Sequence, residues 1–106
     1  ALINGACLSS CADLAAVLQH NKRAVFIGEE TGGGYQGNNS GLIPDSNLSF
    51  GITVSVPLLK YFNAVDQQKN IGRGTMPDLP YQRIAGDIIQ QKDPEMEMAL
   101  KLAQKN

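Results

Sequence analysis

The fold is decided by the stretch ALINGACLSSCADLAAVLQHNKRAVFI, residues 1–27. Its first three residues are apolar and predict a short strand. From Ser10 onward the apolar residues recur at the spacing of one helix face, and Asn21 predicts the end of that helix. Residues 24–27 form a continuous apolar run, which is typical of a strand buried on both faces. Strand, helix and strand at this spacing predict a right-handed βαβ unit and therefore an α/β fold.

The strongest candidate for a reactive residue is Ser9, at the junction of the first strand and the helix. A hydroxyl on a sharp strand-to-helix turn can be reached by a base, and the unpaired N–H groups of the helix N-terminus can stabilise an oxyanion. The same junction also favours a capping serine, which is the commoner role of Ser9 or Ser10 taken alone. Ser10 and Asp13 also have the spacing of a capping box. The local sequence therefore leaves a nucleophile and a helix cap as alternatives.

No general base is evident near Ser9 in the sequence. The only histidine, His20, falls at the far end of the predicted helix. A rise of about 1.5 Å per helical residue separates it from Ser9 by roughly 15 Å, too far to take a proton. Glu29 and Glu30 follow the second predicted strand, but adjacent side chains of an extended segment point apart. We therefore expect both glutamates to have structural roles.

Cys7 and Cys11 are the only cysteines, and they flank Ser9. A disulfide across a strand-to-helix turn at this spacing would be awkward. A metal site would need two further ligands, which His20 alone does not supply. We therefore expect two buried free thiols and no metal.

The composition is that of one globular domain or part of one, with 106 residues, 42% hydrophobic and 18% charged, and a net charge of -1. The scattered basic residues argue against a nucleic-acid partner and against a polybasic membrane anchor. No apolar run approaches the roughly 20 residues that span a bilayer, and no signal peptide is evident. Because the first residues already read as the middle of a strand, we expect residues 1–106 to be the C-terminal part of a longer domain.

Residues 28–41 form a long glycine-rich loop. The loop lacks the Gly-Lys-Ser/Thr ending of a phosphate-binding P-loop, and no Gly-x-Gly-x-x-Gly motif opens a helix there. We expect instead that the loop borders a cleft, where glycines let another backbone approach closely.

The rest of the chain alternates strand and helix signals. Residues 42–44 predict a brief strand and residues 45–47 a turn. Residues 50–56 alternate apolar and polar side chains and predict a half-buried strand. A short helix is expected over residues 84–91, and the pair Asp93-Pro94 is a strong start signal for a final helix.

Four ordered blocks of this sequence resemble the tail-specific, or C-terminal processing, serine peptidases and their tricorn-core relatives. The blocks are Asn4-Gly5 followed by Ser9 and a helix, RAVFIGEETGG at residues 23–33, GRGTMPD at residues 72–78, and the helix that begins at Asp93-Pro94. Any one block is weakly specific, whereas their order and spacing together are fairly specific. The resemblance covers nearly all of the chain.

The resemblance implies a crotonase-like or ClpP-like α/β spiral of βαβ units with an attached β-sheet. Residues 1–106 would be the C-terminal portion of its peptidase domain. By the same resemblance the acylating nucleophile is Ser9, and the backbone N–H of Ser10 is one of two oxyanion donors. The substrates implied are polypeptides bound in an extended form. The resemblance implies no metal or other cofactor, and a location outside the cytoplasm, periplasmic or secreted.

The glycine-rich loop is where this chain departs from the family pattern. The loop residues expected to border a bound substrate are Gly32, Gly33, Gly34 and Tyr35. In the processing branch this loop carries a lysine base, and the matching position here is Gly34. The tricorn branch uses an upstream histidine with a glutamate whose aligned position is about Ile71. The resemblance therefore favours the lysine-lacking branch, with the base supplied from outside these 106 residues and the isolated piece inactive.

Two rival functions compete with the peptidase hypothesis. A catalytically inactive homologue could keep the fold and bind a peptide or an apolar ligand, as the related interphotoreceptor retinoid-binding proteins do. The absence of a lysine at Gly34 and of a glutamate near Ile71 favours this rival. An acyl-CoA enzyme of the crotonase fold has less support, because nothing marks a nucleotide pocket. Open strand edges also predict pairing with another chain, as a homo-oligomer or with a missing N-terminal part.

Overall fold

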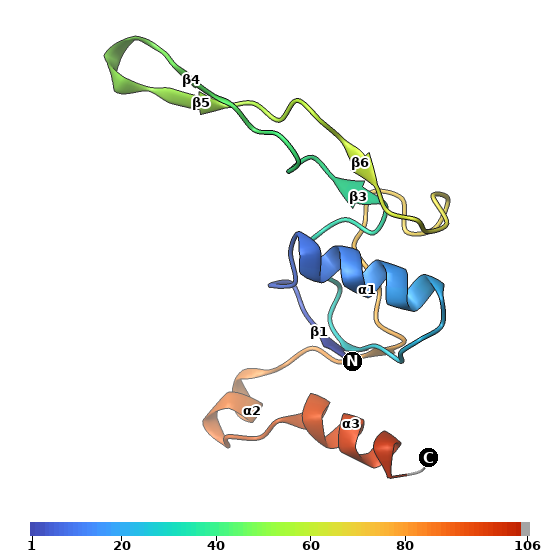
Figure 1. The fold of residues 1–106 in the computed structure, drawn as a ribbon. Helices are drawn as coiled ribbons and strands as arrows, with labels where there is room; N and C mark the ends of the chain where they lie inside the picture. Colours follow the sequence, from blue (N-terminus) through green and yellow to red (C-terminus); the bar gives the residue numbers. More distant parts are fainter. Residues whose placement is uncertain (105–106) are drawn as a thin grey trace.

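The structure is a computed structural model that describes residues 1–104. Within these residues helices and strands are mixed, in agreement with the predicted α/β class (Figure 1). The strands are β1 (Leu2–Ile3), β2 (Ile27–Gly28), β3 (Gly37–Asn38), β4 (Asp45–Asn47), β5 (Thr53–Ser55), β6 (Tyr61–Phe62) and β7 (Leu79–Pro80). The helices are α1 (Ser10–His20), α2 (Ala85–Ile89) and α3 (Pro94–Ala103), with a 3-10 turn over Ser49–Gly51.

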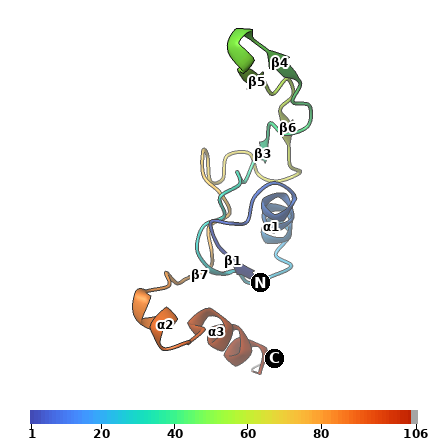
Figure 2. The same cartoon turned by 90° about the vertical axis from the view of Figure 1, so that its left-hand side faces the viewer.

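The centre of the molecule is a parallel sheet in the order β1-β2-β7. Because α1 connects β1 to the parallel strand β2, the predicted βαβ unit is confirmed. Figures 1 and 2 show α1 on one side of this sheet and α3 on the other. The second strand, Ile27–Gly28, overlaps the predicted residues 24–27 only at Ile27, which corrects the predicted bounds.

The core lies between α1 and the sheet. Its buried cluster contains Ile3, Ala15 and Phe26, and the Phe26 side chain is only 1% exposed. Ala16 on α1 is also buried, and such small side chains let the helix approach the sheet closely. Asp78 joins β7 to this core, because its carboxylate accepts the N–H of Phe26 at 2.8 Å and its own N–H donates to the Phe26 carbonyl at 2.9 Å. Packing therefore holds the helix against the sheet, and these hydrogen bonds join the segments that lead into β2 and β7.

A long β-ribbon, residues 37–62, projects from this body (Figures 1 and 2). At its base β3 pairs with β6, and further out β4 pairs with β5, both antiparallel. The ribbon corrects three predictions: residues 42–44 form no strand, residues 45–47 are strand rather than turn, and residues 50–56 are exposed throughout rather than half-buried. The alternation in residues 50–56 remains amphipathic, but no other described segment covers its apolar side.

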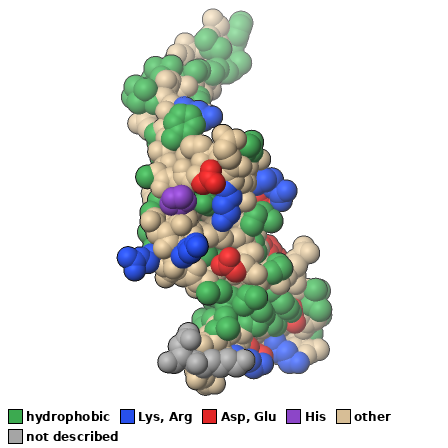
Figure 3. Space-filling view, turned by 90° about the vertical axis from the view of Figure 1, so that its right-hand side faces the viewer, with side chains coloured by type: hydrophobic (Ala, Val, Ile, Leu, Met, Phe, Trp, Pro, Cys, Tyr) green, Lys and Arg blue, Asp and Glu red, His purple; other side chains and the backbone are tan. Residues whose placement is uncertain are grey.

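The register of the ribbon places its apolar residues on one face. Ser46 lies opposite Val54, and Leu48 donates its N–H to the carbonyl of Ile52, so these even-numbered residues share a side. The other face is polar, with hydrogen bonds from Thr53 to Asn47 and from Ser55 to Asp45. In Figure 3 apolar side chains gather over the ribbon and again near the C-terminal helices.

The C-terminal segment has the two predicted helices, and the first of them is shorter than predicted. The expected helix over residues 84–91 is present as α2, and α3 begins at Pro94 as the Asp93-Pro94 pair predicted. The Asp93 carboxylate accepts the N–H of Met96 at 3.1 Å, which caps α3. Helix α3 contacts β1 and β2, and Arg83 pairs with both Asp93 and Glu95 at its start.

Candidate active site

Ser9 occupies the sharp turn between β1 and α1 as the N-cap residue of the helix. Its backbone angles are φ 50° and ψ −128°, a region that a non-glycine residue rarely adopts. The Ser9 side chain is exposed and makes no capping hydrogen bond. The capping interpretation of Ser9 is therefore wrong for this structure, and its hydroxyl points out unpaired.

The amide groups beside Ser9 are partly unpaired. Within residues 1–104 the N–H of Ser10 has no hydrogen-bond acceptor, whereas the N–H of Cys11 donates to Leu8 and that of Asp13 donates to Ser9. Open N–H groups at a helix N-terminus carry a partial positive charge and attract anions. The Ser10 N–H is therefore free to donate to a negatively charged oxygen close to the Ser9 hydroxyl.

The glycine-rich loop packs directly against the Ser9 turn. The N–H of Gly33 donates to the carbonyl of Cys7 at 3.1 Å. A methyl group on Gly33 would lie 2.5 Å from the Ala12 Cβ and 3.3 Å from the Ser9 nitrogen, and one on Gly32 would lie 2.3 Å from the Gly5 carbonyl oxygen. Only glycine fits this approach. The structure thus places the loop beside Ser9.

An open hollow of about 450 Å³ lies next to this loop. Its lining residues are Glu30, Thr31, Gly32, Gly34, Gly72, Arg73 and Gly74. Tyr35 was expected to border a substrate too, but its side chain is fully buried, so that expectation is corrected. The backbone N–H of Tyr35 donates to the carbonyl of Arg73 at 2.9 Å.

Glu30 holds the segment around Arg73 against the loop. Its carboxylate accepts hydrogen bonds from the Arg73 guanidinium and from the N–H of Gly74, the latter at 2.8 Å. These bonds, the Arg73 bond first, lower the pKa of Glu30 from 4.5 to about 2. A carboxylate with so low a pKa is a poor base near neutral pH. The structural role expected for Glu30 is supported.

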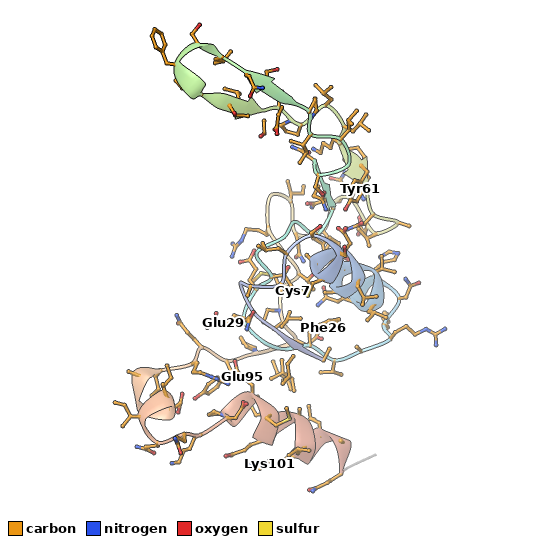
Figure 4. All side chains as sticks on the ribbon, turned by 60° about the vertical axis from the view of Figure 1, so that its left-hand side comes forward. Cys7, Phe26, Glu29, Tyr61, Glu95 and Lys101 are labelled. Atoms are coloured by element: carbon orange, nitrogen blue, oxygen red, sulfur yellow. A yellow bond between two sulfur atoms is a disulfide. The ribbon has the colours of Figure 1, made fainter. Side chains whose placement is uncertain are left out.

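A polar cluster around Asp13 was missed in the sequence. The Asp13 carboxylate accepts hydrogen bonds from the Tyr61 hydroxyl and from the amides of Asn38 and Asn63, so it is not the capping-box partner of Ser10. The Asp13 bond is the main cause that raises the pKa of Tyr61. Figure 4 shows Tyr61 at the base of the ribbon above α1. No local sequence signal could find this cluster, since its members are distant in the chain.

His20 does not reach Ser9. It is the last residue of α1, and its Nδ1 accepts the N–H of Asp66 at 3.3 Å. In the part of the chain that the structure describes, no side chain is hydrogen-bonded to the Ser9 hydroxyl. None of the described side chains is therefore placed to act as a base toward the Ser9 hydroxyl.

Cys7 and Cys11 form a disulfide, so the prediction of two free thiols is wrong. Their Cα atoms are 5.2 Å apart, well within the range that a disulfide spans. The prediction failed because the chain turns tightly at Ser9. This turn brings Cys7 alongside Cys11 in the first turn of α1.

Among residues 1–104, no three His, Cys, Asp or Glu side chains are grouped closely enough to hold a metal ion. None of the described helices is both long and apolar enough to cross a bilayer.

Residues 1–81 match the model of Peptidase family S41. These residues include the Ser9 turn, the glycine-rich loop and β7. No curated protein matches the chain.

Proposed function

The chain belongs to peptidase family S41, and from this premise we propose that it carries the nucleophile of a serine peptidase at Ser9. The observation that supports this most is the state of the Ser9 hydroxyl. It is exposed, uncapped and set on a turn of unusual backbone angles beside the free N–H of Ser10. A serine that merely began the helix would use its hydroxyl as a cap.

In the proposed reaction the Ser9 Oγ attacks the carbonyl carbon of a peptide bond. The Ser9 proton passes to a base outside these 106 residues, and the carbonyl oxygen becomes an oxyanion that the Ser10 N–H stabilises. The C–N bond then breaks, the amine leaves with a proton, and water hydrolyses the acyl-enzyme. Gly34 offers no amine, so the proposal requires a base other than a lysine in this loop.

The glycine-rich loop supports a polypeptide as the substrate. Gly32 and Gly33 press against the Ser9 turn, and Gly32 and Gly34 line the neighbouring hollow. A backbone without side chains leaves room for an extended peptide to lie beside the nucleophile. We propose that the loop forms one wall of the substrate cleft.

The wider setting of the chain is part of the proposal. Residues 1–106 would form the C-terminal portion of a crotonase-like peptidase domain in the lysine-lacking branch. We place the protein outside the cytoplasm, and the Cys7–Cys11 disulfide favours this, because disulfides persist in oxidising compartments.

A second candidate is an inactive homologue that binds a peptide or an apolar ligand. It is favoured by the Ser9 hydroxyl having no base within hydrogen-bonding distance among the described residues. It is also favoured by Gly34 at the position where the processing branch has lysine.

A fluorophosphonate probe on the full-length protein separates the two candidates. The peptidase proposal expects covalent labelling that disappears in Ser9→Ala and persists in Ser49→Ala, an exposed serine of the ribbon. Well-folded wild-type protein that takes up no probe would instead support the binding module. Peptide mapping of the labelled residue identifies the nucleophile directly.

A further inference from the structure

The Cys7–Cys11 disulfide closes a small ring with Ser9 at its centre. Cys7 is buried, and its carbonyl accepts the N–H of Gly33, so this half of the ring is fixed to the glycine-rich loop. Cys11 lies in the first turn of α1 and is exposed. The disulfide therefore ties the loop-anchored side of the turn to the helix side (Figure 4).

The Ser9 conformation differs from that of an ordinary helix cap. A serine at a helix N-cap ordinarily has an extended backbone, and its hydroxyl accepts an N–H of the first turn. Ser9 instead has a φ of 50° and no capping bond. Within residues 1–104 the Ala12 N–H, a natural partner for such a cap, has no acceptor outside the helix. The Ser9 hydroxyl and the Ala12 N–H, which would bond to each other in an ordinary cap, are thus both present but not bonded.

We propose that the Cys7–Cys11 disulfide positions Ser9, deciding whether its hydroxyl is presented for reaction or caps its own helix. The inference rests on the proposed function, because it assigns a positioning role around the proposed nucleophile. With the bond intact, the ring holds the turn and the hydroxyl faces outward. With the bond broken, Ser9 relaxes toward an extended backbone and its hydroxyl accepts an N–H of the first turn.

The bond can be broken by a dithiol reductant that reaches the exposed Cys11. One thiolate of the reductant attacks the Cys11 sulfur, and the Cys7 sulfur leaves and takes a proton. The second thiol of the reductant then displaces Cys11, which is also protonated, and the reductant ends as its own disulfide. Two electrons and two protons thus move to the protein.

The first test measures the labelling rate of the full-length protein by a fluorophosphonate before and after treatment with dithiothreitol. The reduced protein is expected to react roughly ten- to a hundredfold more slowly, the loss that follows from misplacing a reacting atom by up to about 1 Å. The double variant Cys7→Ala/Cys11→Ala should react slowly even without dithiothreitol, and dithiothreitol should not change its rate. Equal rates for oxidised and reduced protein would overturn the proposal.

The second test does not depend on labelling. Amide hydrogen exchange of residues 8–14 is compared in the two redox states, with melting temperatures recorded in parallel. Slower exchange at the start of α1 after reduction is expected, because the hydroxyl then protects an N–H. Unchanged exchange in this segment overturns the positioning role even if no form is labelled. Faster exchange overturns it too, because no cap has then formed. Slower exchange without any labelling retains the role of the disulfide in the turn and rejects the peptidase proposal instead.

Discussion

The body and the ribbon of this molecule both contain apolar sequence but differ in how much of it is buried. In the body, Phe26 is 1% exposed and packs beneath α1. In the ribbon, Phe50 is 100% exposed, as are large parts of the other apolar side chains between residues 41 and 62. The body has a helix and a sheet that cover each other, whereas the ribbon has only one layer. Apolar sequence thus gives a core only where a second layer meets it.

The largest expected effect comes from removing the aromatic ring at the centre of the body. Phe26→Ala should lower the free energy of unfolding by about 3–5 kcal/mol, because it leaves a cavity in a packed core. The matched variant Phe50→Ala should change it by less than about 0.5 kcal/mol, since that ring buries nothing. Urea unfolding followed by circular dichroism measures both. Similar losses from the two variants would show that the ribbon is covered in solution.

A smaller effect is expected where the loop meets the Ser9 turn. Gly33→Ala places a methyl group 2.5 Å from the Ala12 Cβ, so it should cost about 1–3 kcal/mol and abolish fluorophosphonate labelling of Ser9. Gly41→Ala is the control in the ribbon, where the nearest atom is 3.8 Å away. If Gly33→Ala were labelled at the wild-type rate, the contact between the loop and the Ser9 turn would not matter for the reactivity of Ser9.

The ion pair of Glu30 predicts a pH dependence in the body. Its pKa is lowered from 4.5 to about 2, so its stabilising effect is complete above pH 4.5 and is lost as the pH falls toward 2. The protein should therefore unfold more easily by urea at pH 3 than at pH 5. Glu30→Gln should reduce the dependence of the free energy of unfolding on pH. Part of this dependence should remain, because the pKa of Asp87 is also lowered. An unaltered slope would mean that the Arg73 pair is absent in solution.

The smallest effect is expected on the apolar face of the ribbon. Val54→Thr keeps a β-branched side chain at a residue that is 37% exposed, so the new hydroxyl can reach water. We expect a change within about 0.5 kcal/mol in urea unfolding. A clear loss would indicate that another surface lies against this face.

The sequence predicted those features that depend on neighbours in the chain. The βαβ unit, the bounds of α1 near Ser10 and Asn21, and the Asp93 cap each follow from local periodicity and capping chemistry. The position of Ser9 at the turn followed from the same signals.

Other features depend on distant contacts and could not be predicted in this way. The Asp13 cluster joins residues far apart in the chain, and the exposure of residues 50–56 depends on what covers them. The disulfide was rejected because cysteine spacing alone does not show that the chain turns tightly at Ser9. The buried Tyr35 was misplaced because a glycine-rich neighbourhood suggests a surface loop.

The short strands of the ribbon have a consequence for aggregation. Flat, apolar edge strands invite other chains to add to them. Here β4 and β5 are three residues each, Pro44 stands directly before β4, and Pro57 follows shortly after β5. Proline has no N–H to offer an incoming strand. The two prolines therefore limit the addition of further strands to the exposed apolar hairpin, and with it fibril-like growth.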